Sequence, residues 1–361
     1  MRTLILCLLI IPLFQGCTSF STQSSSVQGV QEERRIALVI GNNDYANNKH
    51  AQPQQDHNIS SLTFKSNLPS VMKDVDDMSK TLKDLGFEVL VVRNADKRDM
   101  KIALKAFKRL LDKASEPSTE DKIKEKEKTV VALFYYSGHG MASDNETYLI
   151  PIGMKPIPTD DKGSLDKSLL EQEALRRTDV YNELKITDVK KRDVKKRINF
   201  VILDSCRDTG SSNNEDANNI SLTPKGPRWT VGESNAIVLK GPKREVKLDA
   251  SVGANQSLLT KMPDHTFLAY ATARDNSSIG TTDERLNSLY TKHLLRFISI
   301  PGLPISELFG KVNEAVVEET KQIAEKNPKF KIQEPHFSSN EISSEVNFVF
   351  RKEAVNQAPR W

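Results

Sequence analysis

The sequence has few cysteines, no long apolar run and no strong surplus of either charge. Its 361 residues include 3 cysteines, and 52 Lys and Arg stand against 48 Asp and Glu, which leaves a net charge of +4. So small a surplus gives no support for nucleic-acid binding, which needs a concentrated basic face, and we expect no nucleic-acid partner. With 37% hydrophobic and 28% charged residues, the composition is that of a globular protein and excludes collagen-like and polytopic membrane chains.

The longest apolar run lies at the N-terminus and is too short to cross a membrane. It extends from Leu4 to Phe14 after a short positively charged start, and only Pro12 interrupts it. A spanning helix needs about 20 apolar residues, whereas this pattern is typical of a secretory signal. Gly16 and Cys17 follow. They resemble a bacterial lipoprotein signal site, in which a small residue precedes a cysteine that is lipidated and becomes the N-terminus.

We therefore expect residues 1–16 to be a lipoprotein signal peptide and residues 17–33 to be a Ser/Gln-rich tether. Acylation of Cys17 would anchor the chain in a lipid membrane as a periplasmic or cell-surface lipoprotein. Thr18 stands where an aspartate is associated with inner-membrane retention, which favours the outer membrane. The alternative is an ordinary secretory signal followed by an incidental cysteine.

The remaining cysteines indicate a chemical role for Cys206. Cys7 leaves with the signal, and an acylated Cys17 cannot form a disulfide. Cys206 then has no intramolecular partner, and a free thiol is an oxidation liability in an exported protein. We expect a chemical reason for its presence, with burial as a small apolar side chain as the alternative.

Short continuous apolar runs, typical of strands buried on both faces, alternate with segments of helical spacing. The expected strands are 35–41, 87–92, 129–136, 199–204, 266–273 and a last one at 346–350. The expected helices are 74–85, 102–111, 290–298 and 305–324. This alternation predicts an α/β fold with a mostly parallel sheet, whose ligands lie outside the carboxyl ends of the strands. Residues 207–265 have little periodicity and exceed the usual length of a loop.

Two polar motifs follow neighbouring candidate strands. Ser137-Gly-His139-Gly140 comes after the third strand, and Asp204-Ser-Cys206 ends the fourth. In a parallel sheet both fall on the same edge, and a Cys with a His is the minimum for nucleophilic acyl transfer. Glycines beside the histidine let a substrate approach the backbone closely. Each residue alone has a simpler interpretation, a packed histidine and a buried thiol.

These motifs resemble those of the caspase-like cysteine peptidases, and within them the bacterial relatives of metacaspases and paracaspases. The similar segments are Arg35 to Tyr45, Asp74 to Met78, Leu85 to Val89, Tyr135 to Gly140, Tyr148 to Pro151, Leu203 to Arg207, Ala269 to Ala273, Asn287-Ser288 and Gln333 to Pro335. The resemblance implies a caspase-like sheet, mostly parallel and flanked by helices on both faces. It implies a peptidase domain at 34–351 and a C-terminal tail at 352–361. The 207–265 loop follows Cys206 directly and is rich in Gly, Asn and Ser, so we expect a processing or gating loop that the enzyme itself can cut. The alternative is an inserted loop with ordinary surface charges.

By the same resemblance, His139 is the general base and Cys206 the nucleophile, and the backbone N–H groups of Gly140 and Cys206 bind the oxyanion. The acidic specificity pocket of metacaspase-like members matches Asp74, Ser137 and Asp204. Two carboxylates in a partly desolvated cleft would hold an Arg or Lys side chain. The implied function is a cysteine endopeptidase that cleaves protein or peptide substrates after Arg or Lys. The alternative is a non-catalytic binding or scaffold lipoprotein of the same fold.

The resemblance requires no cofactor, although metacaspase-like enzymes often need Ca²⁺. Asp74, Asp76 and Asp77 offer hard oxygen ligands, but three aspartates on one helical turn are more often a solvated face, and we assign no metal ligand. The histidines outside the motif show no paired spacing, which disfavours a metal-dependent hydrolase.

Overall fold

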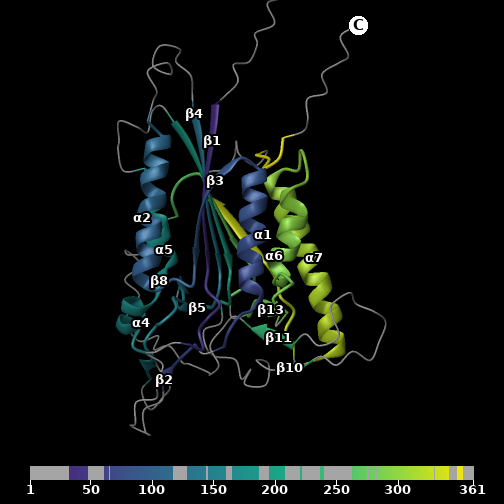
Figure 1. Cartoon of the computed structure of the whole chain (residues 1–361). Coiled ribbons are helices and arrows are strands. Elements are labelled where there is room, and N and C mark those ends of the chain that lie inside the picture. Colours follow the sequence, from purple (N-terminus) through teal and green to yellow (C-terminus); the bar gives the residue numbers. More distant parts are fainter. Residues whose placement is uncertain are drawn as a thin grey trace, which may run out of the picture. The chain divides into compact units, whose positions relative to one another are not determined.

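The computed structural model (Figure 1) describes residues 32–47, 61–64, 66–116, 128–143, 145–159, 165–186, 195–207, 220–221, 236–239, 262–274, 276–281, 283–328, 330–340 and 348–352. The signal peptide, Cys17, almost all of the tether, most of the 207–265 loop and the tail beyond residue 352 lie outside these ranges, so the expectations about them stay predictions. None of the described helices combines the length and the apolar character that crossing a membrane requires.

A six-stranded sheet forms the centre of the domain, in the order β14-β12-β9-β4-β1-β3. These strands are β1 (Glu32–Gly41), β3 (Phe87–Arg93), β4 (Lys128–Ser137), β9 (Lys195–Asp204), β12 (Thr266–Tyr270) and β14 (His336–Asn340). All neighbours pair in parallel except β12 and β14, which are antiparallel. The apolar runs form the four inner strands because helices cover both faces, as in other parallel sheets. The expected mostly parallel α/β fold is confirmed.

Six helices lie within the described residues: α1 (Ser70–Asp84), α2 (Lys97–Ala114), α4 (Lys167–Glu173), α5 (Arg177–Leu184), α6 (Leu289–Ile298) and α7 (Ile305–Lys326). The apolar faces of α1, α6 and α7 pack on one side of the sheet, and those of α2 and α5 pack on the other (Figure 1). Gly86, with φ of 83°, follows α1 in the left-handed region that ends many helices.

Short strands form three further small sheets, and none of these strands was predicted from the sequence. They are β5 (Gly140–Ser143), β6 (Glu146–Leu149) and β8 (Leu175–Arg176), the pair β2 (Ser61–Leu62) and β7 (Ile157–Pro158), and the set β10 (Ile220–Ser221), β11 (Ala236–Leu239) and β13 (Ile279–Thr281). Runs of two to four residues are too short to show a period. The first set matters most, because β5 begins directly after His139.

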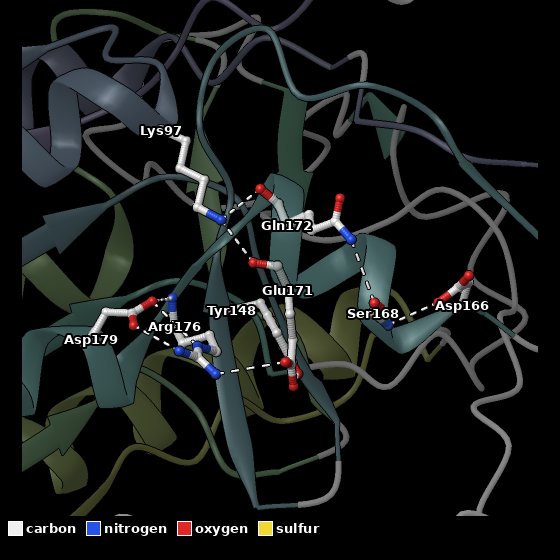
Figure 2. Close-up of polar contacts among 8 residues, drawn as sticks. All are labelled: Lys97, Tyr148, Asp166, Ser168, Glu171, Gln172, Arg176 and Asp179. Atoms are coloured by element: carbon white, nitrogen blue, oxygen red, sulfur yellow. Dashed lines mark hydrogen bonds and ion pairs between the residues drawn. The ribbon is translucent and has the colours of Figure 1, made fainter.

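Polar contacts join α2 to α4, and α4 to the set β5-β6-β8 through Glu171 (Figure 2). The Lys97 ammonium donates to the carbonyls of Glu171 at 2.7 Å and Gln172 at 2.6 Å, which are near the C-terminal end of α4. A cation at that end of a helix is favourable because the last carbonyls lack intrahelical partners. At the start of α5, the Arg176 guanidinium donates to Asp179 at 2.9 Å.

The expected last strand at 346–350 is wrong for the part that the structure describes. The sixth strand of the sheet is β14, and residues 348–352 only form isolated bridges, from Val349 to Pro304 and from Arg351 to Pro301. The guanidinium of Arg35 donates to the carbonyls of Val349 and Phe350. These carbonyls therefore bond to a side chain rather than to a neighbouring strand, while the phenylalanines enter the core.

Replacing Phe350 with alanine should lower the free energy of unfolding by about 3–5 kcal/mol, the usual cost of deleting a buried phenyl ring. The Phe350 ring is 2% exposed and lies 4.8 Å from that of Phe200 and 5.4 Å from that of Phe348, centroid to centroid. Urea unfolding measures the change. Ile102→Ala, at a position 55% exposed, is the matched control and should change stability by about 0.5 kcal/mol or less. Equal losses in both variants would contradict the packing described.

Candidate active site

The ends of β4 and β9 bring the two polar motifs together at the carboxyl edge of the sheet. Ser137 is paired in register with Asp204, and the Gly138 N–H donates to the Asp204 carbonyl at 3.3 Å. Gly140 lies so close to the second motif that a Cβ there would be 2.6 Å from the Ser205 hydroxyl oxygen and 2.9 Å from the Cys206 carbonyl oxygen. A side chain at position 140 would therefore push the two motifs apart.

The orientation of the His139 ring selects its tautomer. His139 is buried, and its Nε2 lies 2.8 Å from the Ser66 carbonyl oxygen. A carbonyl can only accept a hydrogen bond, so Nε2 carries the proton of the neutral ring and Nδ1 carries the lone pair that a general base needs. The rings of Tyr45 and Phe64 pack against the imidazole, with centroids 4.4 and 5.3 Å away.

Cys206 lies beneath the segment that precedes β13. The thiol is buried, and the Ser278 N–H donates to its sulfur at 3.1 Å. The Arg207 N–H donates to the Asn276 carbonyl at 3.1 Å, which holds the same segment over the nucleophile motif. The Ser278 carbonyl oxygen lies 3.8 Å from the same sulfur and accepts a hydrogen bond from the thiol, so this residue contacts the sulfur with both a donor and an acceptor. The Arg207 guanidinium stacks on the Tyr270 ring, with its Cζ 3.8 Å from the ring centroid.

Asp74 is buried at the N-terminal part of α1 and faces the end of β4. Its carboxylate accepts hydrogen bonds from the Ser137 hydroxyl at 2.9 Å, the Ser288 N–H at 2.9 Å and the Asn287 amide at 3.3 Å. The Ser288 hydroxyl lies 2.7 Å from the same carboxylate. Ser137 and Asp74 are thus in direct contact, as the resemblance implied.

Asp204 is the second buried carboxylate of this cluster. It accepts hydrogen bonds from the Ser278 hydroxyl at 2.8 Å and the Thr291 hydroxyl at 2.7 Å, and the Ser288 hydroxyl contacts it as well. Ser288 therefore bridges Asp74 and Asp204. Ser278 joins the cluster to the nucleophile, because its hydroxyl binds Asp204 and its N–H binds Cys206.

Neutral groups surround both carboxylates in these contacts. Burial raises the pKa of Tyr135, and the charges of Asp74 and Asp204 raise it further. Burial followed by the charge of Asp204 does the same to Tyr290. Both tyrosines therefore stay protonated at physiological pH. The hydroxyl and amide donors stabilise both carboxylates.

The three aspartates of α1 do not converge on one ion. Asp74 is buried, which corrects the expectation of a solvated face, while Asp76 pairs with Arg93 and Asp77 pairs with Lys73. Within the described ranges, no group of three or more acidic, His or Cys side chains is arranged to hold a metal. This trio does not fit a Ca²⁺ site, and the expectation that no cofactor is required stays a prediction.

Several residues that contact the candidate site could not be predicted from the sequence. Ser66, Ser278 and Thr291 belong to no motif that the sequence revealed, and their segments approach the sheet edge only in the fold. Ser288 had a partial signal, since Asn287-Ser288 before a helix is one of the segments similar to the family.

Comparison with known proteins gives the family. The family model described as the caspase domain matches residues 34–346. The crystal structure of caspase-1 from Spodoptera frugiperda is similar at 13% sequence identity, with a TM-score of 0.48, over 90% of this chain and 94% of that chain. A search of curated proteins found no significant match. Since the family model spans most of the sequence, the chain belongs to the caspase domain family, a family of cysteine peptidases.

Proposed function

We propose that this protein is a cysteine endopeptidase that uses His139 and Cys206 as a catalytic dyad and cleaves after Arg or Lys. The observation that carries the proposal is the pair of buried carboxylates, Asp74 and Asp204, that Ser288 bridges beside the nucleophile. The second carboxylate is two residues from Cys206 and shares Ser278 with it. A pocket for a basic side chain would thus adjoin the reacting sulfur.

The reaction would begin with proton transfer from the Cys206 thiol to Nδ1 of His139. The thiolate attacks the scissile carbonyl carbon, and the oxyanion that forms accepts hydrogen bonds from the backbone N–H groups of Gly140 and Cys206. The protonated imidazole then gives its proton to the leaving amine, which breaks the peptide bond and leaves a thioester. A water molecule, deprotonated by His139, hydrolyses the thioester and restores the thiol.

The charge of the pocket decides the substrate side chain. A guanidinium or ammonium group between Asp74 and Asp204 forms charge-assisted hydrogen bonds in a site with little water, where they are strong. An aspartate side chain in the same place would be repelled by both carboxylates. Ser137 would complete the pocket at the end of β4. Protein or peptide substrates with basic residues are therefore the proposed class.

A panel of fluorogenic peptides that differ only in the residue before the scissile bond tests this function. Wild type and Cys206→Ala are compared, with and without Ca²⁺. We expect wild type to cleave the Arg and Lys peptides and to leave the Asp peptide intact, and Cys206→Ala to cleave none. Binding without cleavage by wild type in either condition would instead support the scaffold alternative. The same panel measures whether Ca²⁺ is required.

We also propose that Cys17 is acylated and anchors the enzyme in a membrane, with the outer membrane favoured. The basis is the residues that resemble a lipoprotein signal site, since Cys17 lies outside the described residues. Wild type expressed in a bacterial host should partition into detergent, and Cys17→Ser should lose the lipid mass and partition into the aqueous phase. A water-soluble wild-type protein whose N-terminus is not Cys17 would overturn the proposal.

A further inference from the structure

We propose that Tyr45 is a positioning residue for His139, and that its hydroxyl and that of Tyr136 hold the histidine peptide in the orientation that catalysis requires. The proposal rests on the role of His139 as the general base. Tyr45 follows β1, and 94 residues separate it from His139. The fold thus uses a distant segment to fix the base.

Both polar groups of the His139 backbone contact tyrosine hydroxyls. The Tyr45 oxygen accepts the His139 N–H at 3.0 Å, and its own proton is donated to the Ile150 carbonyl at 3.1 Å. The Tyr136 hydroxyl lies 2.8 Å from the His139 carbonyl oxygen and 3.0 Å from that of Ile150, and it shares its one proton between these acceptors. The His139 carbonyl also accepts the Ile150 N–H at 3.1 Å. The hydroxyl oxygens lie 3.4 Å apart.

Tyr45 also holds the His139 side chain. Its ring centroid is 4.4 Å from that of the imidazole, with the planes inclined by 58°. Nε2 is bound to the Ser66 carbonyl on another segment. The imidazole is therefore restrained by a ring contact and by a hydrogen bond, while its backbone is restrained by two hydroxyls. Restraint of this kind keeps a catalytic group near its productive geometry.

Gly138 makes room for the hydroxyl pair. A Cβ at this position would lie 2.5 Å from the Tyr136 hydroxyl oxygen and 2.9 Å from that of Tyr45. Both distances are shorter than van der Waals contact allows, so any side chain would displace the hydroxyls from His139. The glycine that precedes the histidine is explained by this packing.

The hydroxyl pair stays protonated over the pH range of catalysis. Burial raises the pKa of Tyr45 and is the largest effect on the pKa of Tyr136, which is also raised. The hydrogen bonds between these hydroxyls and the backbone of His139 therefore persist at physiological pH. The Tyr45 side chain is only 2% exposed, so water does not substitute readily for its oxygen.

Tyr45→Phe tests the proposal because it keeps the ring and removes only the hydroxyl. The His139 N–H then lacks its acceptor in a buried site, which is costly. We expect kcat to fall about 10–100-fold with little change in KM, and the pH dependence of kcat to shift. Tyr181→Phe, at another buried tyrosine on α5, is the matched control and should keep wild-type kinetics.

Nuclear magnetic resonance of the imidazole nitrogens gives a second readout that needs no turnover. With the His139 signals identified by their loss in His139→Ala, wild type should show one tautomer, protonated at Nε2. Tyr45→Phe should show mixed tautomers or a shifted imidazole pKa. If Tyr45→Phe fails to fold, Tyr136→Phe should give the same changes.

The positioning role of Tyr45 and the proposed function can fail separately. Unchanged imidazole signals together with unchanged kcat in folded Tyr45→Phe and Tyr136→Phe would overturn the positioning role. Inactive wild type on every peptide would overturn the proposed function, while the tautomer measurement would still decide whether Tyr45 positions His139.

Discussion

His139→Ala should lower kcat/KM for an arginyl peptide about 10²–10⁴-fold, the range that loss of a general acid–base side chain produces. In the proposed dyad, Nδ1 of His139 accepts the proton from Cys206, and alanine offers no substitute. The hydrogen bond from Nε2 to Ser66 and the ring contact with Tyr45 show how firmly the imidazole is oriented. Initial rates on a single fluorogenic peptide measure the effect.

The same variant should react slowly with a thiol-directed peptide. Selective alkylation of Cys206 depends on its thiolate, which the imidazole stabilises in the proposed dyad. His336→Ala, at an exposed position on β14, is the control and should match wild type in rate and in labelling. Thermal melting of both variants checks that the buried site has not unfolded. Equal labelling of Cys206 in wild type and in folded His139→Ala would contradict the dyad.

Asp204→Asn should cost about 100-fold in kcat/KM on Arg and Lys peptides, on the order of 3 kcal/mol of transition-state binding. The amide keeps the shape of the buried side chain and removes its charge. The hydroxyls of Ser278 and Thr291 can rotate to accept from it, so we expect the fold to persist. Asp76→Asn, on the exposed side of α1 and paired with Arg93, is the control and should leave the rate unchanged.

A comparison of two substrates separates the effect of the substrate's charge from that of its shape. Citrulline has nearly the shape of arginine without its charge, so wild type should prefer the arginyl peptide by about 100-fold, and Asp204→Asn should lose most of that preference. This result needs no assumption about the stability of the variant, because both peptides meet the same enzyme. Equal cleavage of the two peptides by wild type, or preferential cleavage after aspartate, would refute the pocket assignment.

The sequence predicted the strands that have continuous apolar runs and the helices whose apolar residues have a clear period. Continuous apolar runs predicted β1, β4, β9 and β12, because a strand buried on both faces requires them. They also predicted β3, an edge strand whose apolar residues are mostly only partly buried. The register of parallel strands then placed the His139 and Cys206 motifs at one edge. Phe348 and Phe350 led to the wrong prediction of a last strand. Apolar residues at alternate positions occur both in strands and in segments that only insert rings into the core.

Helical spacing indicates that Asp74 is buried, although three aspartates close together in the sequence favour a solvated face. Val71, Val75, Met78 and Leu82 form the buried face of α1, and Asp74 shares that face by helical spacing. A charged residue at such a position indicates a partner within the fold. The partners themselves could not be predicted, because Ser278, Ser288 and Thr291 reach the carboxylates only after the C-terminal part of the chain has packed on the sheet.

The most direct test of the central claim is mass spectrometry of the protein after reaction with peptidyl chloromethyl ketones. The thiolate displaces chloride and forms a thioether, so the added mass marks the reacting sulfur. The account predicts rapid, single labelling of Cys206 by the arginyl reagent, slow labelling by the aspartyl reagent, and none in Cys206→Ala. Labelling at another residue, or faster labelling by the aspartyl reagent, would contradict it.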